Sequence, residues 1–165
     1  MPREPFNILV VDDSADDLTL MQLAFEHAGL PHRLHALGDG QAAMAYLEGA
    51  GEYRDRDRYP FPDFVLLDLK MPKMSGFDVL HTVRHNDQLL PLVIHILSGS
   101  ALDLDVQRAY ALGANSYLVK PSSLGELVKM VKALHEWHCE VWLPRCAPGA
   151  GEGTRTVACE YEQKR

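Results

Sequence analysis

The chain has 165 residues, 47% hydrophobic and 24% charged, a composition typical of one soluble globular domain with a short appendage. Its 16 Lys and Arg against 23 Asp and Glu give a formal net charge of -7, the wrong sign for a protein that binds nucleic acid backbones. No run approaches the roughly 18 apolar residues of a membrane span, and residues 1–5 lack a signal-peptide core. We expect a cytoplasmic protein that binds neither nucleic acid nor membranes.

Short apolar runs alternate with segments of helical spacing. The five runs are residues 8–11, 34–37, 64–69, 92–97 and 117–119. This alternation predicts repeated β-α-β units. The runs are apolar at successive positions, which favours strands covered by helices on both faces, as in a parallel sheet. The predicted fold class is therefore α/β.

Helices are predicted between these runs. The first begins after Ser14 as N-cap and ends at Gly29. Three shorter helices are expected at about residues 40–48, 76–86 and 102–112. Between the second helix and the third strand, the charge of residues 49–62 alternates, which predicts a solvated surface loop.

The last helix is predicted to be the longest. It opens at Ser122 or Ser123, has apolar residues every three or four positions, and could reach Leu143, where Pro144 stops it. We expect a leader at residues 1–5, one domain at 6–143 and a flexible tail at 144–165 with no output domain. The three cysteines, Cys139, Cys146 and Cys159, lack a CxxC spacing and are expected to be reduced thiols.

Polar residues gather where the predicted strands end. Asp12 and Asp13 follow the first run, Asp68 closes the third, and Ser98 and Lys120 follow the fourth and fifth. In open α/β sheets, ligands bind outside the carboxyl ends of the strands. Each acid alone could be a helix cap, but three acids on neighbouring strand ends near a lysine favour a functional site.

These residue types predict phosphoryl chemistry. Three carboxylates about 4 Å apart would repel one another by roughly 4 kcal/mol per pair at an effective dielectric constant of 20, so a cation is expected among them. Oxygen ligands alone indicate Mg²⁺. A carboxylate beside Mg²⁺ and Lys120 could attack phosphorus, and Ser98 could donate a hydrogen bond to a phosphoryl oxygen.

Four motifs carry a family resemblance. They are VVDDS at residues 10–14, LLDLKMPKMSG at 66–76, LSGS at 97–100 and YLVKP at 117–121. Together they resemble the receiver domain of two-component response regulators over about residues 6–143. The resemblance implies a flavodoxin-like, doubly wound sheet of five parallel strands in the order 2-1-3-4-5, flanked by five helices.

The resemblance also implies a metal site and a phosphoacceptor. Asp68 would accept the phosphoryl group. Asp13 and Asp68 would bind Mg²⁺ directly, together with the main-chain carbonyl of Lys70, and Asp12 would act through water.

A phosphorylation switch is implied as well. Lys120 would pair with the phosphoryl group, and the Lys120–Pro121 bond would be cis. Ser98 would move toward the phosphoryl oxygen while Tyr117 rotates inward, as a shift between two packings.

A finer resemblance concerns the charged loop before PFPDFVLLDLKMPK, the long last helix and the lack of an output domain. These features are similar to the small response regulators paired with cyanobacterial and bacterial phytochromes. The resemblance implies a phytochrome-type histidine kinase as partner and a homodimer through the fourth helix, fifth strand and fifth helix. Apolar Val141, Trp142 and Leu143 offer surface consistent with such a dimer.

The sequence also contains features that other functions and sites would use. His81 and His85, and His135 and His138, have spacings that can hold a metal, but we expect solvated or partly packed side chains; His95 is expected to be a hydrogen-bonded interior residue. A haloacid-dehalogenase-type phosphohydrolase needs a second Asp where this chain has Lys70. A receiver-like scaffold that acts without phosphorylation stays open.

Overall fold

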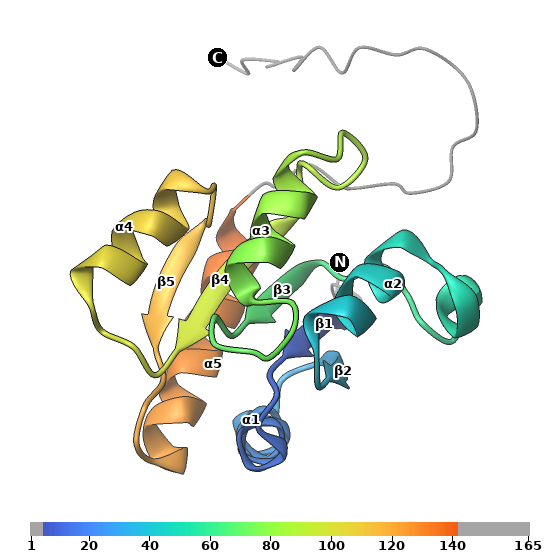
Figure 1. The fold of residues 1–165 in the computed structure, drawn as a ribbon. Helices are drawn as coiled ribbons and strands as arrows, with labels where there is room; N and C mark the ends of the chain where they lie inside the picture. The colour runs from blue at the N-terminus through green and yellow to red at the C-terminus, as the bar shows by residue number, and fades with distance from the viewer. Residues whose placement is uncertain (1–4, 142–165) are drawn as a thin grey trace, which may run out of the picture.

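Five parallel strands form one sheet in the order β2-β1-β3-β4-β5 (Figure 1). The computed structural model describes residues 5–141, so Trp142, Leu143 and the predicted tail lie outside the described residues. The strands are β1 (Phe6–Val11), β2 (His32–Leu37), β3 (Phe64–Leu67), β4 (Val93–Ser98) and β5 (Ser116–Val119). All neighbouring strands pair in parallel, and the predicted flavodoxin-like fold class is confirmed.

Helices cover both faces of the sheet (Figure 1). The helices are α1 (Ala15–Ala28), α2 (Gly40–Glu48), α3 (Gly76–Arg84), α4 (Asp103–Ala111) and α5 (Leu124–Glu140). α1 and α5 pack against one face and α2, α3 and α4 against the other. These helices form two core layers with the sheet. Within β3, Phe64 and Leu66 point into the layer of α1 and α5, and Val65 and Leu67 point into the layer of α2, α3 and α4. This two-sided burial explains why the strand is apolar at every position.

The helix starts follow the predicted caps. Ser14 Oγ accepts a hydrogen bond from Asp17 N at the start of α1, and Ser123, one of the two predicted openers, caps α5 in the same way through Glu126 N. Gly29 ends α1 with φ 66°, a left-handed conformation that glycine adopts without a Cβ penalty.

α5 is shorter than its predicted limit. The helix ends at Glu140, and Val141 is extended with φ -96° and ψ 131°. A β-branched residue loses side-chain freedom in a helix, so Val141 is a poor residue with which to continue one. Of the apolar residues predicted to extend the helix, Val141 alone is described.

The segment at residues 49–62 is more than the solvated loop predicted. A short 3₁₀ helix, η1 (Gly51–Arg54), opens it, and the half-buried Arg56 then folds back onto the end of α2. The Arg56 guanidinium donates to the main-chain oxygens of Tyr46 at 2.8 Å and Leu47 at 2.9 Å. The last carbonyls of a helix lack the regular intrahelical donor, so these bonds make one charge of the run a structural cap for α2.

Candidate functional site

Three carboxylates meet at the carboxyl edge of the sheet. Asp12 and Asp13 follow β1, and Asp68 follows β3, its strand neighbour, where Asp68 N donates to Val11 O at 2.9 Å. Asp12 and Asp68 are buried and Asp13 is exposed. One oxygen of each lies within 4.8 Å of the others, and residues 5–141 contain no second such group of three potential metal ligands. The expected meeting of these three acids is thus observed.

Burial and like charge act together on Asp68. Burial raises the pKa of the Asp68 carboxyl; the charge of Lys120 opposes this rise, and those of Asp12 and Asp13 add to it. A divalent cation would relieve the repulsion, and an all-oxygen donor set with one exposed member fits a hard cation that keeps water ligands.

Lys120 reaches these acids from the end of β5. Its Nζ lies 2.6 Å from Asp12 Oδ2, 2.7 Å from Asp17 Oδ2 and 3.4 Å from Asp68 Oδ1. Burial works against the ammonium charge, but hydrogen bonds to Asp12 and Asp17 and the charge of Asp68 outweigh it and raise the pKa of Lys120 above its usual range. Lys120 is therefore a fixed cation at the site.

The prediction of a cis peptide bond before Pro121 is wrong. The Lys120–Pro121 bond is trans, as are all peptide bonds in residues 5–141. Trans is the intrinsically favoured form of an X-Pro bond, by about 0.5–1 kcal/mol. Lys120 N still donates to Ser98 O at 2.8 Å, which joins the ends of β4 and β5 beside the acids.

Ser98 and Tyr117 both contact the loop that follows β4. Ser98 is buried, and its Oγ accepts a hydrogen bond from Ser100 N at 3.2 Å. The Tyr117 hydroxyl donates to Ser100 O at 2.8 Å, and Ser100 Oγ donates to Asp105 Oδ2 on α4. Ser100 thus connects the two residues predicted to act as a switch: its main-chain N–H bonds Ser98, and its main-chain oxygen bonds Tyr117.

Two site residues are absent from the sequence-based prediction. Asp17, in the first turn of α1, pairs with Lys120, although a helix-start aspartate is ordinarily explained by the helix dipole. Gly76 lies under Asp68: a Cβ there would collide with the main-chain oxygen of Asp68 and lie 2.8 Å from Leu69 Cα. Its position within the LKMPKMSG segment was the available signal.

His95 is a buried, hydrogen-bonded residue as predicted, and it has an unpredicted partner. Its Nε2 lies 2.9 Å from His138 Nε2 and its Nδ1 2.6 Å from Ser116 Oγ. His138 is itself buried, more deeply than the solvated or partly packed state expected for it. His135, the other member of that predicted pair, lies 3.5 Å from Cys139 Sγ.

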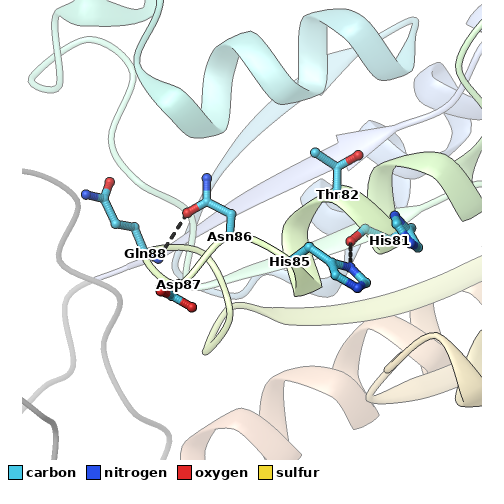
Figure 2. A pocket seen from close by; sticks show the side chains of 6 residues that line it. All are labelled: His81, Thr82, His85, Asn86, Asp87 and Gln88. Atoms are coloured by element: carbon cyan, nitrogen blue, oxygen red, sulfur yellow. Dashed lines mark hydrogen bonds between the residues drawn. The ribbon is translucent and has the colours of Figure 1, made fainter.

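His81 lies in the last turns of α3, and His85 directly follows that helix (Figure 2). Both are exposed, as predicted, and their rings stack with centroids 4.1 Å apart. They line an open hollow together with residues of the loop that follows α3. Because α3 runs back along the strands, its C-terminal end lies at the opposite end of the sheet from the end of β3, which Asp68 follows (Figure 1).

Known proteins share this fold and these motifs. The family model described as "Response regulator receiver domain" matches residues 8–132. The response regulator Rcp1 of Synechocystis sp. is 38% identical over 141 residues, which cover 85% of this chain and 94% of Rcp1. Its Mn²⁺-bound structure has a TM-score of 0.74 at 38% identity and covers 86% of this chain and all of that one.

Two further relatives match as broadly. The probable methanogenesis regulatory protein FilR2 of Methanothrix harundinacea is 37% identical over 138 residues, 82% of this chain and 84% of FilR2. The phosphorylated cyanobacterial phytochrome response regulator RcpA has a TM-score of 0.77 and 33% identity, over 86% of this chain and 99% of that one. These matches do not favour a phosphohydrolase of the haloacid dehalogenase type. The chain belongs to the response regulator receiver family of two-component signalling proteins.

Proposed function

We propose that this protein accepts a phosphoryl group on Asp68 from a histidine kinase and passes that state on through protein contacts. The observation that carries the proposal is the buried Asp68 carboxylate, 3.4 Å from Lys120 and grouped with two further acids at the carboxyl edge of the sheet. The functional unit is the domain expected at residues 6–143, and its role is signalling.

The transfer is a displacement at phosphorus. A carboxylate oxygen of Asp68 forms a bond to phosphorus while the bond from phosphorus to the imidazole nitrogen of the donor breaks. The electron pair of that bond leaves with the nitrogen. Hydrolysis later removes the phosphoryl group. Water adds to phosphorus, the Asp68 carboxylate leaves, and a proton is released with inorganic phosphate.

Mg²⁺ is the proposed cofactor. Asp13, Asp68 and the main-chain carbonyl of Lys70 would hold it, and Asp12 would act through water. When bound, the cation supplies neutralising charge to the carboxylates and the phosphoryl oxygens. Lys120 supplies a second positive charge, and Ser98 donates a hydrogen bond to a phosphoryl oxygen. The Mn²⁺-bound structure of Rcp1 supports a divalent cation at the site.

Ser98 and Tyr117 are the proposed switch. Once Ser98 turns to the phosphoryl group, its bond from Ser100 N is given up, and the loop that also anchors the Tyr117 hydroxyl shifts. Tyr117, which is only half-buried, then rotates inward. The phosphoryl group selects this second packing because it binds better there.

A phytochrome-type histidine kinase is the proposed partner, supported by the breadth of the match to RcpA. The test is transfer from such a kinase, autophosphorylated and then freed of ATP, to the wild type and to Asp68→Asn. We expect a rapid gain of one phosphoryl group by the wild type alone. Equal labelling of Asp68→Asn would refute the site, and transfer only from unrelated histidine kinases would refute the phytochrome pairing.

A homodimer through α4, β5 and α5 is also proposed. Large apolar side chains are exposed on each of these elements, namely Leu104, Tyr110, Val119 and Trp137. Apolar surface shared by neighbouring elements is typical of a protein interface.

A further inference from the structure

Lys120 is held by carboxylates from three separate elements. Asp12 follows β1, Asp68 follows β3, and Asp17 belongs to the first turn of α1. The distances from Nζ are 2.6 Å to Asp12, 2.7 Å to Asp17 and 3.4 Å to Asp68. In this state the ammonium is therefore closer to Asp17 than to the residue that the proposed chemistry modifies.

The first turn of α1 is anchored where it can present Asp17 to the lysine. Ser14 N donates to Asp12 Oδ1 at 2.9 Å, and Asp17 N donates to Ser14 Oγ at 3.2 Å. Asp12 thus contacts both Lys120 and the start of α1. The Asp17–Lys120 pair is part of this bonded network rather than an isolated surface contact.

The space beside Asp17 is too small for a ligand that this carboxylate could bind. Asp17 and Lys120 line a cavity of about 40 Å³ together with apolar residues of α1 and α5, among them Leu20 and Met21. That volume suits one or two water molecules rather than a small-molecule ligand. The contact that remains to explain Asp17 is the one with Lys120.

An ammonium group has three protons to donate, and three carboxylates already surround this one. Oxygens of a phosphoryl group on Asp68 would need at least one of those donors. Asp17 is the carboxylate that returns to water most easily, because its side chain is 40% exposed, against 6% for Asp12 and 7% for Asp68. The bond to Asp17 is therefore the one given up.

We propose that Asp17 is a positioning residue that holds Lys120 against α1 while Asp68 is unmodified and competes with the phosphoryl group for the lysine ammonium. This inference rests on the proposed function. It makes the Asp17–Lys120 pair a restraint on phosphorylation, which is released when the phosphoryl group is bound.

The test compares Asp17→Asn with the wild type, because asparagine keeps the shape of the side chain and removes its charge. We measure binding of beryllofluoride, a phosphoryl mimic, by calorimetry with Mg²⁺, and the lifetime of the phosphorylated form after acetyl phosphate is removed. The variant should bind beryllofluoride roughly two- to fivefold more tightly, the fold-change of one partly exposed ion pair, and lose phosphate more slowly by a similar factor.

Two controls separate this restraint from a general charge effect. Asp16→Asn removes the same charge from an exposed neighbour in the same turn and should leave both quantities near wild type. In a Lys120→Gln background, Asp17→Asn should no longer change beryllofluoride affinity, because the competing pair is gone. Equal effects of the two aspartate variants, an effect that persists without Lys120, or weaker binding by Asp17→Asn would each overturn the inference.

Failure of the proposed function gives a different result. If the wild type neither binds beryllofluoride nor gains a phosphoryl group, the proposed function fails and this inference fails with it. If the wild type does both and Asp17→Asn matches it, the inference alone is overturned.

Discussion

At the scale of single residues, burial and nearby charges act in opposite directions on Asp68, the proposed phosphoacceptor. Burial raises the pKa of Asp68, and the nearby Lys120 ammonium partly offsets that rise. Lys120 keeps its proton because the carboxylates around it outweigh its own burial. A bound cation would add positive charge beside the three acids, which Lys120 alone does not neutralise.

Two buried histidines, His95 and His138, make the stability of the fold depend on pH. Burial lowers the pKa of His95 to about 4, and burial with the charges of His95 and His135 lowers that of His138 to about 3. Both imidazoles are neutral in the folded protein at pH 7. The unfolded chain takes up protons below pH 6.5, so acid favours unfolding as the pH falls from about 6.5 toward these folded values.

We therefore predict that stability to urea falls between pH 7 and pH 4, by roughly 3 kcal/mol from His95 alone. The raised pKa of Asp68 acts in the other direction, because protonation of that group is easier in the folded state. Urea unfolding of His95→Gln, in which the amide can still bond Ser116, should show a clearly smaller loss with acid than the wild type.

The matched control is His85→Gln, which removes an exposed histidine. Its pH dependence should follow that of the wild type. If His95→Gln and His85→Gln lose the same stability on acidification, the buried pair does not govern this part of the pH profile.

Sequence reasoning identified the residues that local position defines and missed those defined by packing. Asp12, Asp13, Asp68 and Lys120 were found because each lies at the end of a predicted strand. Asp17 was missed because its contact with Lys120 joins positions 103 residues apart and depends on how α1 packs beside α5, the helix that follows Lys120. Contacts of this kind carry no local signal in the chain.

At the scale of elements, the start of α3 fixes the strand end that carries Asp68. Gly76 N donates to Leu69 O at 3.0 Å, and the missing side chain lets the helix approach the main chain of Asp68. The glycine is needed here for close approach rather than for backbone freedom, since its φ is not positive.

Gly76→Ala should therefore destabilise the protein by roughly 1–3 kcal/mol, as expected for overpacking, and should slow phosphorylation by displacing Asp68. Thermal unfolding and the rate of labelling by acetyl phosphate measure the two effects. Gly125→Ala on α5 is the matched control: nothing lies within 4 Å of its added Cβ, so it should be neutral or stabilise by about 0.4–1 kcal/mol. Equal stability of the two variants would contradict the proposed role of Gly76.

Periodicity and caps predicted the elements well, and tertiary contacts explain the differences. β1, β3 and β4 are recognisable because burial on both faces leaves continuous apolar runs, and Ser14, Gly29 and Ser123 mark helix limits. The charge alternation around Arg56 predicts a solvated loop, because it does not indicate that one guanidinium will cap α2.

At the scale of the whole molecule, the two core layers leave an apolar surface on α4, β5 and α5. Leu104, the most exposed large hydrophobic residue among those described, is 78% exposed, and Val119 of β5 is 49% exposed. No helix within residues 5–141 is long and apolar enough to cross a membrane. The proposed use of this surface is the contact with a second copy.

We predict a dimer mass in light scattering at high micromolar concentration with beryllofluoride and Mg²⁺. Leu104→Glu should shift the mass toward the monomer, while an acid in the first turn of α4 suits the helix itself. Leu90→Glu, a comparable exposed leucine outside these three elements, should leave the dimer intact. A monomer mass for the wild type under these conditions would rule out the proposed dimer.

The step on which the proposed function depends is phosphorylation of Asp68 with the help of a divalent cation. Its most direct test is the intact mass of the wild type and of Asp68→Asn after exposure to acetyl phosphate, with Mg²⁺ or with EDTA. We predict a gain of one phosphoryl group only for the wild type with Mg²⁺. An equal gain by Asp68→Asn, or a gain by the wild type that is undiminished in EDTA, would contradict the account.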